Sequence, residues 1–221
     1  MNGNTALDLV MARLVRSSDT SLRATARAEM NNLMHTALEM GPMPMWFLLD
    51  QDTSVSTAVG TETVAMPAGF LRFDDNLEVG GIFLYDTDIT GPDKWVRLDR
   101  SGFNKMQDFY GDEDATGVPG VYDIVVDTAY LRPIPDGVYQ LKVWGYFADS
   151  DVADAATTNL WLTHAADLLI ATTAELLARV YLRNAELAVA MQEDIKRATI
   201  RLATANTAFM ESMKMRAMGD D

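Results

Sequence analysis

Residues 185–213 read AELAVAMQEDIKRATIRLATANTAFMESM and carry the most regular apolar pattern in the chain. The apolar residues alternate between spacings of three and four: Ala188, Met191, Ile195, Ala198, Leu202, Ala205 and Phe209. This heptad-like spacing predicts one long helix with a single packing face. At 1.5 Å per residue the helix is about 40 Å long, so it has to pack on other helices of this chain or of a neighbour.

Helical periodicity also appears near the start of the chain and just before this long helix. Ser17, Ser18 and Asp19 separate two N-terminal helices and are candidates for the N-cap of the second. The apolar positions of the two helices are Leu7, Val10, Met11, Leu14 and Val15, then Leu22, Ala26, Met30, Leu33 and Ala37. A further helix is predicted by Leu168, Leu169, Leu176, Leu177 and Val180.

The middle of the chain changes to the pattern of short strands separated by turns. Residues 140–144 alternate polar and apolar side chains, as a half-buried antiparallel strand does. Residues 101–106 predict a short helix or turn within this region. The predicted strands, rich in β-branched and aromatic residues, are 45–49, 61–66, 81–85, 95–98, 121–126 and 138–147.

The order of these elements predicts an α+β fold. Helices from both chain ends form a helical bundle, and an antiparallel β-sandwich or β-barrel domain is inserted between them. We expect residues 1–43 to supply the N-terminal helices, residues 44–156 the β-rich insert, and residues 157–221 the C-terminal helices and tail.

Charge is concentrated in the insert. The 221-residue chain has 18 basic and 32 acidic residues, a formal net charge of −14. Residues 44–156 contain 7 of the basic and 20 of the acidic residues. Such a surface disfavours wrapping of nucleic acid, because affinity for phosphate comes mainly from Lys and Arg. The longest apolar runs fall far short of the roughly 20 residues of a spanning helix, so we expect no membrane association.

The side chains that perform catalysis are scarce. The chain has no Cys, and its two histidines, His35 and His164, fall in separate predicted helices without metal-ligand spacing to a second ligand. The sequence contains no nucleotide-binding or nucleophile-elbow motif. We therefore expect no enzymatic activity, no catalytic residues and no cofactor.

One acidic stretch has the order of a calcium loop. Asp112, Asp114, Gly117 and Asp123 place oxygens at alternate positions, a Gly at the bend and a late carboxylate. The twelfth position is Asp in place of the usual Glu, Pro119 falls inside the loop, and the flanks predict strands in place of paired helices. An acidic surface loop is the preferred interpretation, and no metal site is expected.

The C-terminal tail combines methionines with basic residues. Flexible thioethers suit adaptable packing surfaces, and exposed methionines at a free end favour docking on a partner over solvent. A frayed end is the alternative. The residues concerned are Met210, Met213, Lys214, Met215, Arg216 and Met218.

In its ordered set of motifs the chain resembles the adaptor, or head–tail connector, proteins of tailed bacteriophages. The resemblance covers nearly the whole chain, with Gly69 and residues 145–146 departing from the family pattern. No single motif is diagnostic, and the ordered set carries the resemblance. Its motifs are Trp46-Phe47-Leu48-Leu49, residues 60–72 with Pro67-Ala68-Gly69-Phe70-Leu71, residues 120–124, 131–137 and 141–146, then Asn159, Trp161-Leu162 and Leu168-Leu169-Ile170.

The resemblance implies a structural virion protein of the phage neck that assembles in the host cytoplasm. It implies a ring of twelve copies, docked on the portal protein and on a tail or nozzle protein, with DNA passing through the central channel without specific binding. It also implies that the C-terminal segment reaches the portal, which makes Met210, Met213, Lys214, Met215, Arg216 and Met218 the expected portal interface.

Two alternatives remain open from the sequence. Another virion β-sandwich protein that binds a receptor or glycan would use exposed aromatics such as Trp95, Phe109 and Tyr110. A calcium-dependent hydrolase would use the stretch from Asp112 to Asp123, and calcium would then raise its melting temperature markedly.

Overall fold

The computed structural model describes residues 1–41, 45–73, 80–86, 94–110, 115–153 and 159–217, without the side chains of 107–110 and 213–217. The chain divides into two compact units. The helical unit comprises Met1–Leu48 and Ala148–Asp221, and the β unit comprises Leu49–Phe147. The sequence placed these boundaries near residues 43 and 156. The first boundary differs because residues 46–48 form a 3-10 turn before the first strand, and the second because Asp149 and Val152 bond to Glu39, Asn31 and Trp161 of the helical unit.

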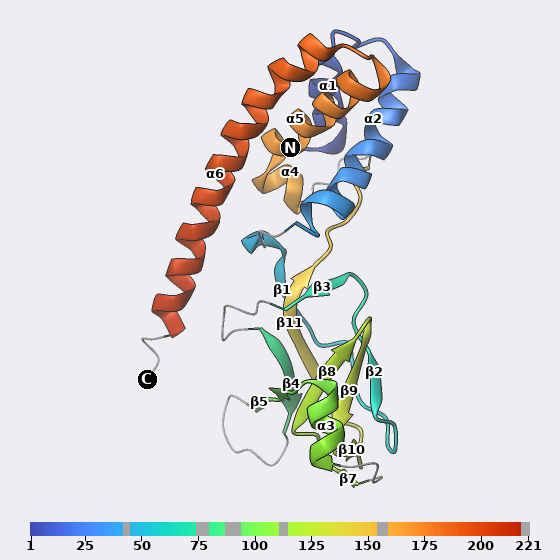
Figure 1. Cartoon of the computed structure of the whole chain (residues 1–221), viewed down its shortest axis with the longest axis vertical. Coiled ribbons are helices and arrows are strands. Elements are labelled where there is room, and N and C mark those ends of the chain that lie inside the picture. Colours follow the sequence, from blue (N-terminus) through green and yellow to red (C-terminus); the bar gives the residue numbers. More distant parts are fainter. Residues whose placement is uncertain (42–44, 74–79, 87–93, 111–114, 154–158, 218–221) are drawn as a thin grey trace. The chain divides into compact units, whose positions relative to one another are not determined.

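The helical unit draws its helices from both ends of the chain (Figure 1). Its elements are α1 (Gly3–Arg13), α2 (Thr20–Leu33), the π-helical turn η1 (Met34–Leu38), the 3-10 turn η2 (Trp46–Leu48), α4 (Leu160–His164), α5 (Ala166–Leu176), the π-helical turn η3 (Leu177–Tyr181) and α6 (Ala185–Ala217). Helix α5 lies at the centre and packs against α1, α2, α4 and α6. Its residues Leu168 to Ala171 are all at most 5% exposed, which explains why its sequence is apolar on every side.

The N-termini of these helices are fixed by side-chain caps. Asn2, Asp19 and Asn159 accept hydrogen bonds from the backbone N–H three residues on, at 2.8–2.9 Å. Asn184 caps α6 in the same way through the N–H of Leu187 at 3.1 Å. Each cap satisfies an N–H that has no partner inside its helix, so the sequence itself determines where these helices begin.

Two of the expected packing positions are wrong. Val15 is 84% exposed because α1 ends at Arg13 and Val15 has a positive φ of 55°. In the second helix, burial passes from Met30 to Met34, which is 0% exposed, and Ala37 faces solvent. A straight helix advances 3.6 residues per turn, and the π-helical turn η1 changes the direction of the side chains that follow.

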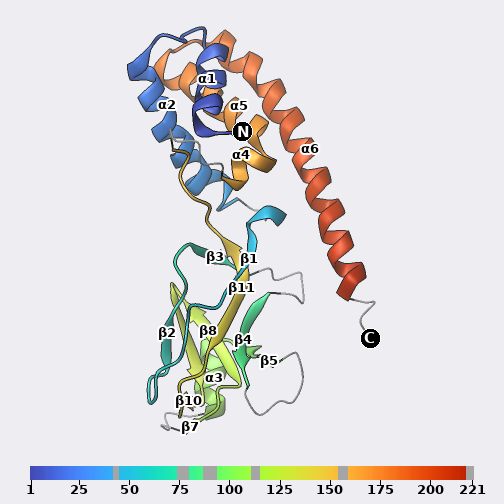
Figure 2. The same ribbon diagram turned by 180° about the vertical axis from the view of Figure 1, so that it is seen from behind.

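The described part of the β unit is a sandwich of two larger sheets, with one helix and a short two-stranded sheet, β10-β7 (Figures 1 and 2). One sheet has the order β1-β11-β4-β5, with β3 also paired to β11, and the other has the order β2-β9-β8-β6. The strands are β1 (Leu49–Asp52), β2 (Thr63–Ala65), β3 (Phe70–Arg72), β4 (Gly81–Tyr85), β5 (Trp95–Arg97), β6 (Asp99–Arg100), β7 (Thr116–Gly117), β8 (Val121–Val125), β9 (Thr128–Arg132), β10 (Ile134–Pro135) and β11 (Leu141–Phe147), and the helix is α3 (Phe103–Tyr110).

The two sheets share one hydrophobic core. Inward-facing side chains of both sheets form this cluster: Val64, Ile82, Leu84, Leu98, Tyr122, Ala129, Leu131, Leu141 and Val143. Helix α3 covers the opposite face of β8 and β9, where the ring of Phe103 meets that of Tyr130 edge-on at 5.2 Å. The α+β fold and the sandwich are therefore confirmed.

The structure corrects several details of the predicted β region. The two sheets remain separate among the described residues, so no closed barrel forms, and the short pairs β6–β8 and β7–β10 are parallel. Residues 46–48, expected as strand, form the 3-10 turn η2, and the strand begins at Leu49. Strand β9 was missed because its hairpin turn, Val126-Asp127, contains no Gly or Asn.

The chain enters and leaves the β unit through adjacent strands. Strands β1 and β11 pair antiparallel, with Leu49 opposite Tyr146 and Asp52 opposite Val143. The first and last strands of the insert are therefore direct neighbours in one sheet.

Candidate functional site

The long helix α6 forms one side of a groove in the helical unit, which consists of the two adjoining pockets described below. It packs on α5 and η3 through Ala188, Ala198 and Leu202, each at most 5% exposed. The predicted helix is confirmed, but its seam shifts near the end: Ala205 is exposed and Asn206 is 7% exposed. An α-helix drifts about 20° per heptad against a strict seven-residue repeat, so the buried position moves forward by one residue.

Asn206 ties α6 to the turn η2. Its Oδ1 accepts a hydrogen bond from the backbone N–H of Trp46 at 2.9 Å. The Trp46 ring lies 6.4 Å from Phe209 and 5.6 Å from His164, and Phe47 stacks on His164 at 5.2 Å. The exposed His164 ring thus borders an aromatic cluster formed with Trp46 and Phe47.

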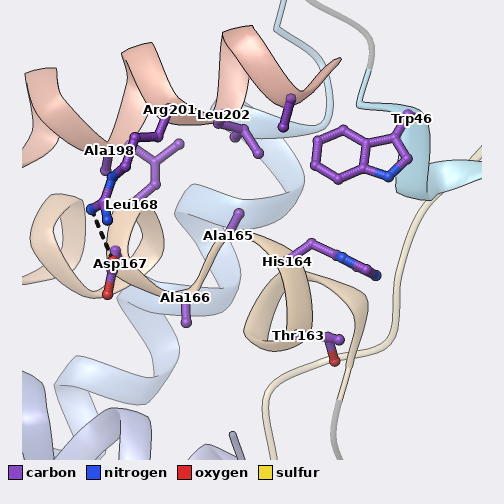
Figure 3. Close-up of a pocket in the computed structure, with 11 residues that line it drawn as sticks. Trp46, Thr163, His164, Ala165, Ala166, Asp167, Leu168, Ala198, Arg201 and Leu202 are labelled. Atoms are coloured by element: carbon purple, nitrogen blue, oxygen red, sulfur yellow. Dashed lines mark hydrogen bonds and ion pairs between the residues drawn. The ribbon is translucent and has the colours of Figure 1, made fainter. Parts of the chain in front are cut away.

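A pocket of about 370 Å³ opens between α6 and the start of α5 (Figure 3). Trp46 borders it on one side, and on the other side Arg201 reaches Asp167 with a nitrogen–oxygen distance of 2.9 Å. Small side chains leave the space open. The pocket is lined by Trp46, Thr163, His164, Ala165, Ala166, Asp167, Leu168, Ala198, Arg201, Leu202 and Ala205.

A second pocket of about 540 Å³ adjoins the first, sharing Asp167 and Arg201. Arg13 lies 3.4 Å from Asp194, and Arg197 lies 2.8 Å from the same residue. The side chains of Arg197 and Arg201 are 70% and 69% exposed, so their ion pairs contribute little to stability. Small alanine side chains and exposed arginines paired with Asp167 and Asp194 thus lie side by side along this groove.

A polar cluster holds the returning chain against the N-terminal helices; it comprises His35, Glu39, Asp149, Asp151 and Trp161. Glu39 Oε1 accepts hydrogen bonds from Trp161 Nε1 at 3.1 Å and from the backbone N–H of Asp149 at 3.0 Å. Asp149 in turn accepts from the N–H of Trp161 at 3.1 Å. The Glu39 side chain is fully buried, and these donors satisfy it.

His35 completes the polar cluster by bridging two carboxylates. Its Nδ1 lies 2.8 Å from Glu39 Oε2 and its Nε2 lies 2.8 Å from Asp151 Oδ1. Burial lowers the pKa of His35, but the hydrogen bonds and charges of Glu39 and Asp151 outweigh it and raise the pKa above the ordinary 6.5. Only the imidazolium can donate to both carboxylates at once, so the charged form fits this geometry.

The residues of the candidate calcium loop and those of the expected portal interface lie partly outside the described residues. Asp112, Asp114 and Met218 fall there, as do the side chains of Met213, Lys214, Met215 and Arg216, although α6 runs through Ala217. Asp123 accepts a hydrogen bond from the N–H of Phe103 at 2.7 Å and so supports the start of α3. Met210 is half-buried on α6.

Within the described ranges, no group of three or more His, Asp and Glu side chains could hold a metal ion. Of the helices the structure describes, none has both the length and the apolar character needed to cross a membrane.

Sequence reasoning missed both the groove and the polar cluster. The cluster joins residues 110 to 122 positions apart, which no local pattern reveals. The groove had a weak local signal, the Arg197 and Arg201 pair on one helix face beside Ala198 and Ala205.

The comparisons with known proteins agree with the resemblance drawn from the sequence. The family model described as SU10 adaptor protein matches residues 4–216. No curated protein matches the chain. Since the family match spans both the helical unit and the β unit, it describes the whole architecture and not one segment. The chain belongs to the SU10 adaptor protein family.

Proposed function

We propose that this protein forms a ring of twelve copies in the phage neck, docked on the portal protein on one side and on a tail or nozzle protein on the other, with DNA passing through the channel. Membership of the SU10 adaptor family makes the chain a bacteriophage adaptor, a structural protein. The match over residues 4–216 is the observation that carries the proposal. Assembly takes place in the host cytoplasm before the protein joins the virion.

The acidic charge of the chain supports the passage of DNA without specific binding. The formal net charge is −14. A surface of this sign gains little from phosphate contacts, which depend on Lys and Arg. DNA can therefore move past the protein without being held.

The C-terminal end of α6 is the proposed portal contact. Helix α6 continues through Ala217, so the Met-rich and basic stretch prolongs the long helix. Methionine side chains from 210 onward would fill apolar grooves of the portal, and Lys214 and Arg216 would meet its acidic groups.

The test is to mix the purified protein with the portal particle from the same genome and to image the mixture by electron microscopy. An added ring with the symmetry of the portal is the expected result. A portal that stays bare at high protein excess would contradict the proposal.

Truncated and charge-reversed variants test the portal contact separately. A chain ending at Phe209 should lose portal binding while its far-ultraviolet circular dichroism shows an intact fold. The double variant Lys214→Glu and Arg216→Glu should weaken binding, whereas Lys196→Glu, an exposed lysine of the same helix, should not. Unchanged binding by the truncated chain would overturn the role of the tail.

A further inference from the structure

The outward face of the sheet β1-β11-β4-β5 carries an unusual concentration of aromatic rings. Along β4 and β11 the alternate residues Ile82, Leu84, Leu141 and Val143 are 1–2% exposed and belong to the sandwich core. The intervening residues point away from that core and are half-buried. They include Phe83, Tyr85 and Trp144, and Trp95 of β5 joins them.

These side chains contact one another and two lysines. We call the set Phe83, Tyr85, Lys94, Trp95, Lys142 and Trp144 the aromatic–lysine face. Lys142 Nζ lies 4.8 Å from the ring centres of both Phe83 and Trp95, and Lys94 Nζ lies 6.0 Å from that of Tyr85. The rings of Tyr85 and Trp95 meet edge-on at 5.1 Å, and those of Phe83 and Trp144 are 6.3 Å apart.

The outward faces of the two sheets differ in what packs on them. Helix α3 packs over β8 and β9 on the face of the other sheet. On the aromatic–lysine face, the elements that pack against β4, β5 and β11 in the described part of the β unit are strands of the same sheet. The outer face of an antiparallel sheet is ordinarily polar, so a group of four half-buried aromatic rings on this face indicates a surface that contacts another protein.

Charge indicates which protein fits there. The β unit contains 17 acidic and 7 basic residues, so most of its surface charge is negative. In the described part of the chain, Lys94 and Lys142 make ring contacts and no ion pair with a carboxylate. They remain able to pair with carboxylates of a partner.

We propose that the aromatic–lysine face is the surface on which a second copy of this chain docks, through an acidic part of that copy's β unit. The inference deepens the proposed function and rests on it, since it says which surface joins neighbouring copies in the ring. In a ring each copy uses two different patches, one on each side. A cationic aromatic patch on a unit that is otherwise acidic supplies two such complementary patches.

The chain has no Cys, so a single introduced thiol reports on one position. The variant Lys94→Cys places a thiol on the aromatic–lysine face, and Val126→Cys places one at an 85%-exposed hairpin turn as the control. The rate of maleimide labelling is measured for each variant across a range of protein concentrations, with and without the portal particle. We expect assembly to slow labelling of the Lys94→Cys variant at least about tenfold and to leave the control unchanged.

A charge reversal provides an independent measurement. Lys142→Glu should lower ring assembly at least about tenfold, since it places a carboxylate against an acidic partner. Lys105→Glu makes the same change at an exposed position of α3 and should assemble as the unaltered chain does. Circular dichroism confirms that each variant is folded.

The outcomes separate the two proposals. Rings on the portal with a protected thiol support both. Rings with an unprotected thiol and a normally assembling Lys142→Glu variant overturn the docking surface alone. A bare portal with a thiol protected in concentrated protein overturns the adaptor function alone. A bare portal and a thiol reactive at every concentration overturn both. Protection by an added glycan or oligonucleotide, without self-association, would also overturn the docking surface.

Discussion

Trp161 Nε1 donates a hydrogen bond to Glu39 Oε1 at 3.1 Å, and this bond joins residues 122 positions apart. The two residues are 0% and 2% exposed, so the carboxylate is held inside the helical unit by the donors of the polar cluster. A buried carboxylate keeps its charge only where such donors are present. The bond thus connects the two chain segments of the helical unit.

Glu39→Ala should lower the free energy of unfolding by about 3 kcal/mol, because Trp161 Nε1 and the N–H of Asp149 lose their acceptor inside the unit. Urea unfolding followed by circular dichroism at 222 nm, where the helices dominate, measures the change. Glu193→Ala, at an exposed position of α6, is the matched control and should change stability little. Equal stability of the two variants would show that the buried acceptor is dispensable.

Stability should depend on pH through His35. Its pKa is raised above 6.5 in the folded state, because hydrogen bonds to Glu39 and Asp151 outweigh the effect of burial. The folded state therefore binds the proton more tightly than the unfolded state. The stabilisation is complete below pH 6.5 and is lost as the pH rises through the folded pKa.

The urea concentration at the midpoint of unfolding should therefore fall as the pH is raised from about 6 to about 9 for the unaltered chain. His35→Gln, which does not titrate, should remove this part of the slope. The folded pKa itself can be read from the pH dependence of the His35 imidazole resonances in NMR spectra. A slope of the same size in His35→Gln would assign the pH dependence to other groups.

Val126→Gly should stabilise the β unit by about 1 kcal/mol. Val126 is the first residue of a two-residue hairpin turn and has a φ of 57°, a region that costs an L-residue about 1–2 kcal/mol. Gly adopts this φ without strain, which offsets its larger entropy in the unfolded chain. Val118→Gly makes the same change at an exposed valine without a positive φ, and it should not stabilise. Thermal unfolding of both variants decides the point.

Asn206→Ala should lower the free energy of unfolding by about 1–2 kcal/mol, because the N–H of Trp46 loses its acceptor in a partly buried position. The Trp46 indole should also change its fluorescence, since the turn η2 is no longer held on α6. Gln192→Ala, at an exposed position of the same helix, is the control. A native melting curve for Asn206→Ala would mean that water replaces the lost bond.

The helical spacing of apolar residues and the strand-like segments predicted most of the helices and strands. The elements that were misplaced or missed have physical causes. The long helix followed from the spacing of Ala188 to Phe209, but that spacing put Ala205 in the seam, whereas the drift of a 3.6-residue helix buries Asn206 there. Strand β9 was missed because Val126 has a positive φ in its turn, a conformation that Gly and Asn favour and that a valine does not signal.

The candidate site was harder to predict than the fold. The polar cluster is built from His35 and Asp151, which lie 116 positions apart, and only the folded helices bring them together. The aromatic–lysine face was not predicted, although the sequence indicated a half-buried strand over residues 140–144 and named Trp95 as an exposed aromatic. Its contacts, such as that between Lys142 and Trp95, depend on the pairing of β4 with β5 and β11.

The adjacency of β1 and β11 has a consequence for how such a chain can change over time. Leu49 and Tyr146 are cross-strand partners, and such partners have Cα atoms about 4.5–5.5 Å apart. The two ends of the β unit are therefore as close as the ends of a hairpin, and a different domain with neighbouring termini could replace it without rerouting the helical unit. Because its two ends are adjacent, the β unit is an insertion that recombination could exchange without altering the sequence of the helices.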